Sequence, residues 1–344
     1  MKTIFISISI LSTLLFSSCN FSSAESPELT KGDSTNAKNE ILQLSRTIPL
    51  SGVKGRIDHM AYDAVGQRLF INALVNGTLE IVDLKTNKVI HSIANLAEPQ
   101  GIVFIPEKKQ IIVSCGNDGT LKIFDSENYS QIISISVGSD ADNVRYDSIF
   151  QEIIVGYDGG MAIVNGKDYK ISANIELDGH PESFQIDHAA GKIFVNVPDA
   201  YEVEVIDRAK KEVISKWNLT DAKANFPMEL DVTNHRIFIG ARRPSEIIQL
   251  DELSGKVISK FNCSGDADDL FYDPNSKLVF VSCGAGYVEI FKEENPTVFS
   301  AASGVSSRLG SRTSLLIANE RKYFLAVPAI PGKDAELRIY NLNY

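Results

Sequence analysis

The sequence has few cysteines and lacks the motifs of the common catalytic sites. Its four cysteines show no CxxC or Cys–His spacing, which argues against a zinc site of the usual kind. The motifs GxSxG, HExxH and Walker A are absent, as is GxGxxG in a βαβ setting, so the usual serine-hydrolase, zinc-protease and nucleotide-binding sites are excluded. No window shows a sustained 3.6-residue apolar period, and we therefore expect few helices.

The chain also has fewer positively than negatively charged residues. The chain of 344 residues has a net charge of −10 and a pI of about 5.1. This balance favours solubility and disfavours binding to a phosphate backbone. We therefore expect no nucleic-acid partner.

What the chain does contain is a sevenfold repeat of about 42 residues. An apolar block recurs with offsets of 42, 42, 40, 44, 42 and 45 residues. Such a period indicates one supersecondary unit per repeat. The blocks begin at Leu69, Ile111, Ile153, Ile193, Ile237, Val279 and Phe324.

Each repeat has the pattern of four short strands. The first often ends at an aspartate, as in the segment 143–147, NVRYD, and the apolar block is the second. A third strand such as 78–83, TLEIVD, and a fourth such as 88–93, KVIHSI, complete the unit. Short runs of Val, Ile, Phe and Tyr between turn residues are typical of strands. Seven such units predict an all-β fold, a seven-bladed β-propeller of four-stranded blades.

The ends of the repeat array support a closed ring. The seventh repeat stops after its third strand, at residues 336–342, while an extra strand pattern occurs at residues 41–50. We expect this N-terminal strand to complete the last blade, which would leave no open sheet edge. The propeller should therefore occupy residues 41–344 as one domain.

Residues 79–93, LEIVDLKTNKVIHSI, resemble the repeat of the YVTN-repeat propellers, including the YncE-like periplasmic proteins. The resemblance covers nearly all of the chain after residue 40. The Tyr-Val-Thr-Asn signature itself is absent, and its positions hold INAL, VSCG or VNVP. The resemblance implies the propeller architecture and leaves the activity open. The single tryptophan, Trp217, and the lack of a Trp-Asp dipeptide disfavour WD40 and tryptophan-rich quinoprotein blades.

The N-terminus has the layout of a secretory signal. Lys2 precedes an apolar run from Thr3 to Phe16, which is too short to span a bilayer as a mature helix. The segment LFSSC, ending at Cys19, resembles a bacterial lipobox, although Phe16 is unusual there. We therefore predict a lipoprotein signal peptide at 1–18, a lipidated Cys19, a flexible polar tether at 19–40, and a location in the bacterial periplasm or cell envelope. Ordinary cleavage after Ala24 is the alternative.

The loops that lead into the first strands should crowd one end of the central channel. A ring of convergent polar side chains at a concave mouth is a candidate binding site. The alternative is a wet, polar channel in which these side chains cap backbone groups. From the seven repeats the residues are Asp58 and His59; Glu98 and Gln100; Asp142 and Asn143; His180, Glu182 and Ser183; Asn225 and Glu229; Asp268 and Asp269; Arg312 and Thr313.

Two groups in this ring suggest specific chemistry. Carboxylates and imidazoles that converge could hold a divalent cation, although an isolated histidine is more often structural; the predicted ligands are His59, Asp142, His180 and Glu182. Arginines suit carboxylate or phosphate capture, although pairing with the aspartates of blade six is the simpler alternative; these are Arg242, Arg308 and Arg312.

These observations lead to three functional hypotheses. The first is a non-enzymatic, monomeric binding module for a small anionic molecule or an envelope protein, attached to the membrane only by its lipid. The second is a metal-dependent hydrolase similar to gluconolactonase-like propellers, in which Glu, Asn and Asp hold a channel metal; Glu182, Asn143, Asn225 and Asp268 would be the analogues by residue type. The third is a purely structural or assembly role. Because a fold does not determine function, the sequence leaves all three open.

Overall fold

The structure, a computed structural model, describes residues 40–219 and 221–344. The predicted signal peptide, Cys19 and nearly all of the predicted tether lie outside these residues. Within them, no helix has the length and hydropathy needed to cross a membrane.

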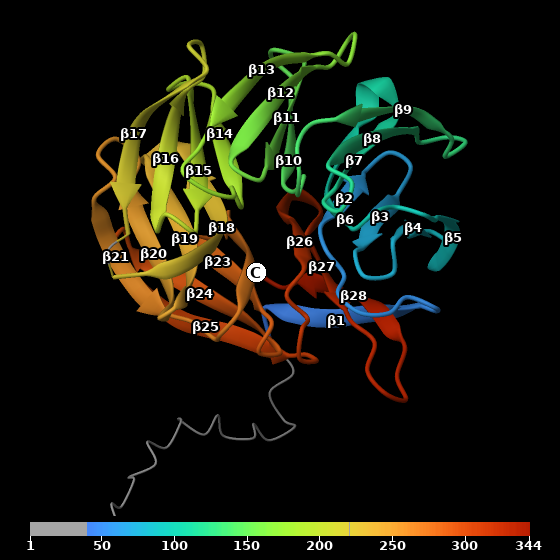
Figure 1. Cartoon of the computed structure of the whole chain (residues 1–344). Coiled ribbons are helices and arrows are strands. Elements are labelled where there is room, and N and C mark those ends of the chain that lie inside the picture. Colours follow the sequence, from blue (N-terminus) through green and yellow to red (C-terminus); the bar gives the residue numbers. More distant parts are fainter. Residues whose placement is uncertain (1–39, 220) are drawn as a thin grey trace, which may run out of the picture. The chain divides into compact units, whose positions relative to one another are not determined.

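Seven four-stranded antiparallel sheets form the blades of a propeller (Figure 1). Blade one contains β2 (Met60–Asp63), β3 (Arg68–Ala73), β4 (Thr78–Asp83) and β5 (Lys88–Ile93). Blade two contains β6 (Pro99–Ile105), β7 (Gln110–Cys115), β8 (Thr120–Asp125) and β9 (Gln131–Ser136). Blade three contains β10 (Val144–Asp147), β11 (Glu152–Tyr157), β12 (Gly160–Asn165) and β13 (Ile171–Glu176).

The remaining blades follow the same order along the chain. Blade four contains β14 (Phe184–Asp187), β15 (Lys192–Val197), β16 (Glu202–Asp207) and β17 (Glu212–Asn218). Blade five contains β18 (Lys223–Asp231), β19 (Arg236–Arg243), β20 (Ser245–Asp251) and β21 (Val257–Asn262). Blade six contains β22 (Ala267–Asp273), β23 (Leu278–Cys283), β24 (Tyr287–Asn295) and β25 (Val298–Ser306). Within the described part of the chain, three short 3-10 helices occur at Pro106–Lys108 (η1), Val232–Asn234 (η2) and Ala318–Glu320 (η3).

The seventh blade confirms the predicted closure of the ring. It consists of β26 (Ser314–Ile317), β27 (Lys322–Val327), β28 (Ala335–Leu342) and the N-terminal strand β1 (Leu42–Leu50), which forms its outer edge. β1 runs antiparallel to β28, with Leu42 opposite Leu342 and Leu50 opposite Ala335. The last blade is therefore assembled from both ends of the propeller sequence.

The second and third strands of each blade are the most buried, and this explains their composition. In β3 every residue after Arg68 is buried, and in β23 all six residues are. A strand covered on both faces needs apolar side chains at successive positions, which is why the apolar block of each repeat is continuous. The fourth strands alternate between exposed and partly buried residues, as in β17, because one of their faces is in water.

The first strands line the axis of the ring. β2 contacts β6 and β26, and β22 contacts β18 and β26, so first strands of adjacent blades meet around the centre (Figure 1). Side chains at alternate positions of these short strands point into the central channel. This arrangement places the loops before the first strands, and the candidate residues they carry, around one cavity.

Candidate functional site

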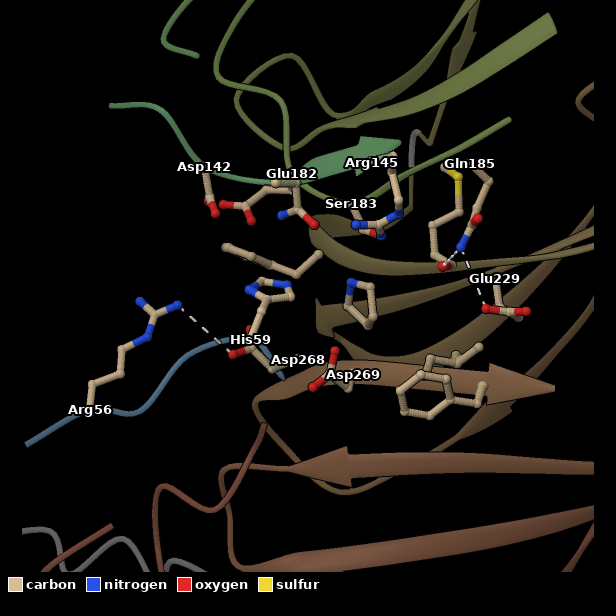
Figure 2. A pocket seen from close by; sticks show the side chains of 16 residues that line it. Arg56, His59, Asp142, Arg145, Glu182, Ser183, Gln185, Glu229, Asp268 and Asp269 are labelled. Atoms are coloured by element: carbon tan, nitrogen blue, oxygen red, sulfur yellow. Dashed lines mark hydrogen bonds and ion pairs between the residues drawn. The ribbon is translucent and has the colours of Figure 1, made fainter. Parts of the chain in front are cut away.

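A cavity lies on the channel axis among the first strands of blades three to six and the loop before β2 (Figure 2). Its volume is about 510 Å³ including the open mouth, so the cavity suits a small ligand. Its charged lining consists of Arg56, His59, Asp142, Arg145, Glu182, Glu229, Asp268 and Asp269.

A repeated backbone motif positions the leading polar residue of each first strand. In blade three, Asp142 N donates to Gly156 O at 3.0 Å, and Gly156 N donates to Asn143 O at 2.9 Å. Blade four repeats the pair, with Glu182 N donating to Asn196 O at 2.9 Å. These bonds fix the backbone before each short strand, so the side chains of successive blades are presented at the same depth.

Asp142 and Glu182 line this cavity and converge with His180, which lies beside them but is not in the lining. One carboxylate oxygen or ring nitrogen from each lies within 4.8 Å of the others, and His180 Nε2 is 3.6 Å from Asp142 Oδ2. Asp142 and Glu182 lie next to each other in Figure 2. Asp142 Oδ1 and His180 Nδ1 are buried without a hydrogen-bond partner among the described residues. Two carboxylates and an imidazole form a ligand set that suits zinc or manganese.

The electrostatics of these three residues favour a positive occupant. Burial, followed by the charge of Asp142, raises the pKa of Glu182 well above its usual value. Burial lowers the pKa of His180, but the close approach of Asp142 and the charges of Glu182, Asp142 and Asp140 together outweigh burial and raise that pKa to about 9. The cluster therefore retains protons that a divalent cation could replace.

His59 is held by a different carboxylate. Its Nδ1 lies 2.7 Å from Asp58 Oδ1, and Arg56 Nη2 lies 2.9 Å from Asp58 Oδ2. Burial lowers the pKa of His59, but the charge and hydrogen bond of Asp58, together with the charges of Asp269 and Asp142, outweigh burial and raise that pKa to about 10. His59 is thus a cationic side chain of the pocket, and it is not part of the cluster formed by Asp142, His180 and Glu182.

Two further carboxyl groups, those of Glu229 and Asp269, line the cavity. Burial raises the pKa of Glu229 to about 8, although the charge of Arg145 opposes it. Burial likewise raises the pKa of Asp269 to about 7, against the charge of His59. Gln185 Nε2 donates to Glu229 Oε2 at 3.4 Å, as Figure 2 shows. Both acids can therefore exchange a proton near neutral pH.

These raised values predict a pH-dependent stability. The pKa of Glu229 rises from 4.5 to about 8 on folding, so the folded state binds more protons than the unfolded state between these pH values. The free energy of unfolding should then fall as pH rises from about 4.5 to 8. Urea unfolding in EDTA at pH 5, 6, 7 and 8 measures this slope. This slope should flatten in Glu229→Gln. It should persist in Glu212→Gln, which changes an exposed glutamate of β17. An equal slope in both variants would contradict the assignment of the raised pKa to Glu229.

The three predicted arginines are paired with acids in the structure. Arg242 binds Asp268 and stacks on Phe226, with the guanidinium carbon 3.7 Å from the ring centroid. Arg312 Nη1 lies 2.9 Å from Asp266 Oδ1. Arg308 Nη2 lies 2.9 Å from Glu336 Oε2, and its Nη1 donates to the carbonyls of Pro328 and Asp334. Pairing with the aspartates of blade six, the simpler alternative, therefore describes Arg242 and Arg312, whereas Arg308 pairs with a glutamate of blade seven. None of the three lines the cavity.

The amide residues divide between the cavity and the interblade contacts. Asn143 lines the cavity, and its Oδ1 has no partner among the described residues. Gln100 Nε2 instead donates to Asp140 Oδ1 at 2.9 Å. Asn225 is fully buried, and its Nδ2 donates to Asn196 Oδ1 and Glu202 O, each at 3.1 Å. Gln100 and Asn225 thus lie outside the cavity lining.

Two cavity residues, Arg145 and Gln185, were missed because they lie within a strand. They occupy the same position of β10 and β14, two residues after Asn143 and Ser183, and Glu229, which was predicted, occupies that position in β18. Since side chains in a strand alternate between faces, this position points to the same side as Asn143 and Ser183. A count of polar residues at every second position could have found them.

Comparisons with known proteins give distant relatives. No protein-family model matches the chain. The uncharacterized protein YncE of Salmonella typhimurium is 25% identical over 140 residues, which is 40% of this chain and 39% of YncE. The YncE of Salmonella typhi is 24% identical over the same length. The match therefore spans about two-fifths of the length of these relatives.

Solved structures match over much more of the chain. A chain of the Kuenenia stuttgartiensis hydrazine synthase superposes with a TM-score of 0.72 and 15% identity, covering 81% of this chain and 96% of that one. A chain of the mitotic checkpoint complex superposes with a TM-score of 0.75 and 10% identity, covering 97% and 100%. At these identities the likeness concerns the fold alone. The chain is a seven-bladed β-propeller with a distant similarity to YncE.

Proposed function

We propose that this propeller is a non-enzymatic binding module of the cell envelope, whose channel cavity takes a small ligand through a divalent cation on Asp142, His180 and Glu182. The observation that carries the proposal is the convergence of these three side chains within 4.8 Å. Asp142 Oδ1 and His180 Nδ1, which are buried without a hydrogen-bond partner among the described residues, supply the second support, because such atoms are rare in folded proteins.

The charge of the cavity determines how an anionic ligand would bind. The lining carries five carboxyl groups against Arg56, His59 and Arg145, and the arginines at the rim are paired. A free anion would have to compete with these carboxyl groups for the three cationic side chains. A divalent cation would reverse the local charge, so an anionic group could bind as a further ligand of the metal while His59 contacts its other oxygens.

The proposed location depends on the N-terminal sequence. Export and lipidation are supported by the apolar run from Thr3 to Phe16 and by the segment that ends at Cys19. A change of Cys19 to Ser should then release the protein from the membrane fraction of the cells that express it. Membrane association that survives this change would contradict the lipid anchor.

The cation site predicts metal-dependent stabilisation. Protein stripped with EDTA should gain free energy of unfolding when Zn²⁺ or Mn²⁺ is added, by about 2.7 kcal/mol at 100 times the dissociation constant. The gain should disappear in Asp142→Asn and Glu182→Gln, because each removes one negative ligand. Thermal unfolding with and without metal measures it.

A matched control comes from blade six. Asp268 occupies the position of Asp142 and Glu182 in the repeat and lines the same cavity, but it is paired with Arg242. Asp268→Asn should keep the metal-dependent gain. If the wild-type protein shows no gain with either metal, or if Asp268→Asn loses the gain as the other variants do, the site is not formed by Asp142, His180 and Glu182.

A metal-dependent hydrolase of lactones is the second candidate. The hydrolase function is favoured by Glu229 and Asp269. Their pKa values of about 8 and 7 allow proton transfer near neutral pH. A bound metal would supply an activated water. Turnover of simple lactones by the metal-loaded protein, abolished in Glu182→Gln, would favour this candidate. Metal binding without turnover of any lactone would favour the non-enzymatic binding module.

A further inference from the structure

A second cluster of acids lies in blade four, outside the channel cavity. Asp178 is in the loop from β13 to β14, and Glu202 and Glu204 are on β16. One carboxylate oxygen of each lies within 4.8 Å of the others. Asp178 N also donates to Glu204 Oε1 at 2.7 Å. None of the three lines the channel cavity.

Two of these carboxylates are buried and incompletely bonded. Glu204 is 0% exposed and Glu202 is 8% exposed. Glu204 Oε2 and Glu202 Oε1 have no hydrogen-bond partner among the described residues. Leaving a buried carboxylate oxygen unpaired is costly, so this cluster needs a partner that the protein's described side chains do not supply.

The other blades show what a satisfied glutamate at this position looks like. Glu80 occupies the position of Glu204 in blade one, and its Oε1 accepts from Thr78 Oγ1 at 2.7 Å and Ser92 Oγ at 2.9 Å. Glu289 occupies it in blade six and accepts from Ser264 N at 2.7 Å and Ser264 Oγ at 2.9 Å. Blade four has instead a second glutamate, at the position of Thr78, and an aspartate in the adjoining loop.

The charge of the cluster is only partly balanced. Lys216 pairs with Asp178, and both side chains are largely in water. Against three carboxylates, this single ammonium leaves an excess of two negative charges. Burial, followed by the charge of Glu204, raises the pKa of Glu202, and burial raises that of Glu204, so without a cation the cluster must retain protons.

We infer that Asp178, Glu202 and Glu204 form a calcium site distinct from the channel site. The ligand set consists only of oxygen atoms, which Ca²⁺ prefers, and the exposed Asp178 leaves room for the waters that complete its coordination. The histidine in the channel cluster selects differently, because imidazole suits zinc and manganese. Calcium would therefore prefer the blade-four site, and zinc or manganese would prefer the channel site.

The calcium site would position the channel site through one loop. Residues 177–183 join β13 to β14, and this loop carries Asp178 at one end and His180 and Glu182 toward the other. Calcium on Asp178 would tie the loop to β16 and restrict the motion of His180. Occupation of the blade-four site is thus expected to tighten metal binding in the channel.

Calorimetric titration of Ca²⁺ into EDTA-stripped protein tests the assignment. Glu204→Gln and Glu202→Gln should each weaken one calcium-binding event about tenfold or more, because calcium affinity follows the charge of its ligands. Glu80→Gln is the matched control in blade one and should bind as the wild type does. Glu182→Gln, in the channel, should also keep this event.

A fifth variant separates a ligand role from a structural one. Lys216→Met removes the ammonium that competes for Asp178, so it should tighten Ca²⁺ binding, whereas a loss of general stability would not. The inference is overturned if the wild type binds no Ca²⁺, if Glu204→Gln and Glu80→Gln bind it equally, or if only Glu182→Gln abolishes binding. The last result would place calcium in the channel.

Discussion

Removal of strand β1 is expected to unfold the propeller. Leu42, Ile48 and Leu50 are 0–1% exposed in the seventh blade, and burying each such side chain contributes about 1.5–3 kcal/mol. Their sum is comparable to the whole net stability of a domain, about 5–15 kcal/mol. The loss would also expose the edge of β28, which invites aggregation. A chain beginning at residue 52 should therefore be aggregated or unfolded by circular dichroism and size-exclusion chromatography, whereas one beginning at residue 40 should melt cooperatively.

Single changes within the same strand provide the control. Ile48→Ala should cost about 2–5 kcal/mol, because it leaves a cavity between the strand and the core. Leu44 lies in the same strand but is 52% exposed, so Leu44→Ala should change the free energy of unfolding by less than about 0.5 kcal/mol. Equal effects of the two changes, or a cooperative fold in the chain beginning at residue 52, would show that β1 is not needed for closure.

Loss of Arg236 should destabilise the contact between blades five and six. Its guanidinium donates to Asp231 Oδ2 at 2.7 and 3.1 Å, and to the two oxygens of Glu293 at 3.2 and 3.1 Å. Tyr272 OH also donates to Glu293, at 2.5 Å. All four side chains are buried. Arg236→Met would leave two buried carboxylates without their cation, which costs about 3–5 kcal/mol, and urea unfolding at pH 7 measures the loss.

Lysine should not replace this arginine. A single ammonium cannot reproduce the fork that serves both Asp231 and Glu293, so Arg236→Lys should recover only part of the stability. Lys170→Met is the comparison, since Lys170 is 81% exposed and its pair with Asp168 spans 3.9 Å; it should cost less than about 1 kcal/mol. A small loss in Arg236→Met, equal to that of Lys170→Met, would mean that water compensates the two carboxylates.

The fold could be predicted from the sequence because each repeat carries its own complete signal. The third strands predicted at 78–83 and in the later repeats coincide with β4, β8 and β16. The spare strand at residues 41–50 indicated the closure that β1 makes with β28. Local alternation and a constant period are properties of neighbouring residues, so one sequence suffices to detect them.

The candidate site was only partly predictable, because its members meet through space. The channel loops were recognised from their place in the repeat, and Asp142, His180 and Glu182 do converge. Arg242 pairs with Asp268, and Asn225 donates a hydrogen bond to Asn196. Both contacts depend on side-chain directions between blades. Serine and threonine hydrogen bonds satisfy Glu80 and Glu289 in the structure. Only by comparison with these two residues is the unbalanced charge of Glu202 and Glu204 recognised.

The pairing of β1 with β28 has a topological consequence. Asn343 N donates to Ile41 O at 2.9 Å, so the backbone before the first blade and the backbone after the last run within one hydrogen bond of each other. A short peptide joining these two positions would turn the propeller into a covalent circle without displacing a strand. Any of the loops between blades could then serve as the point where the circle is cut, because no blade would be first or last.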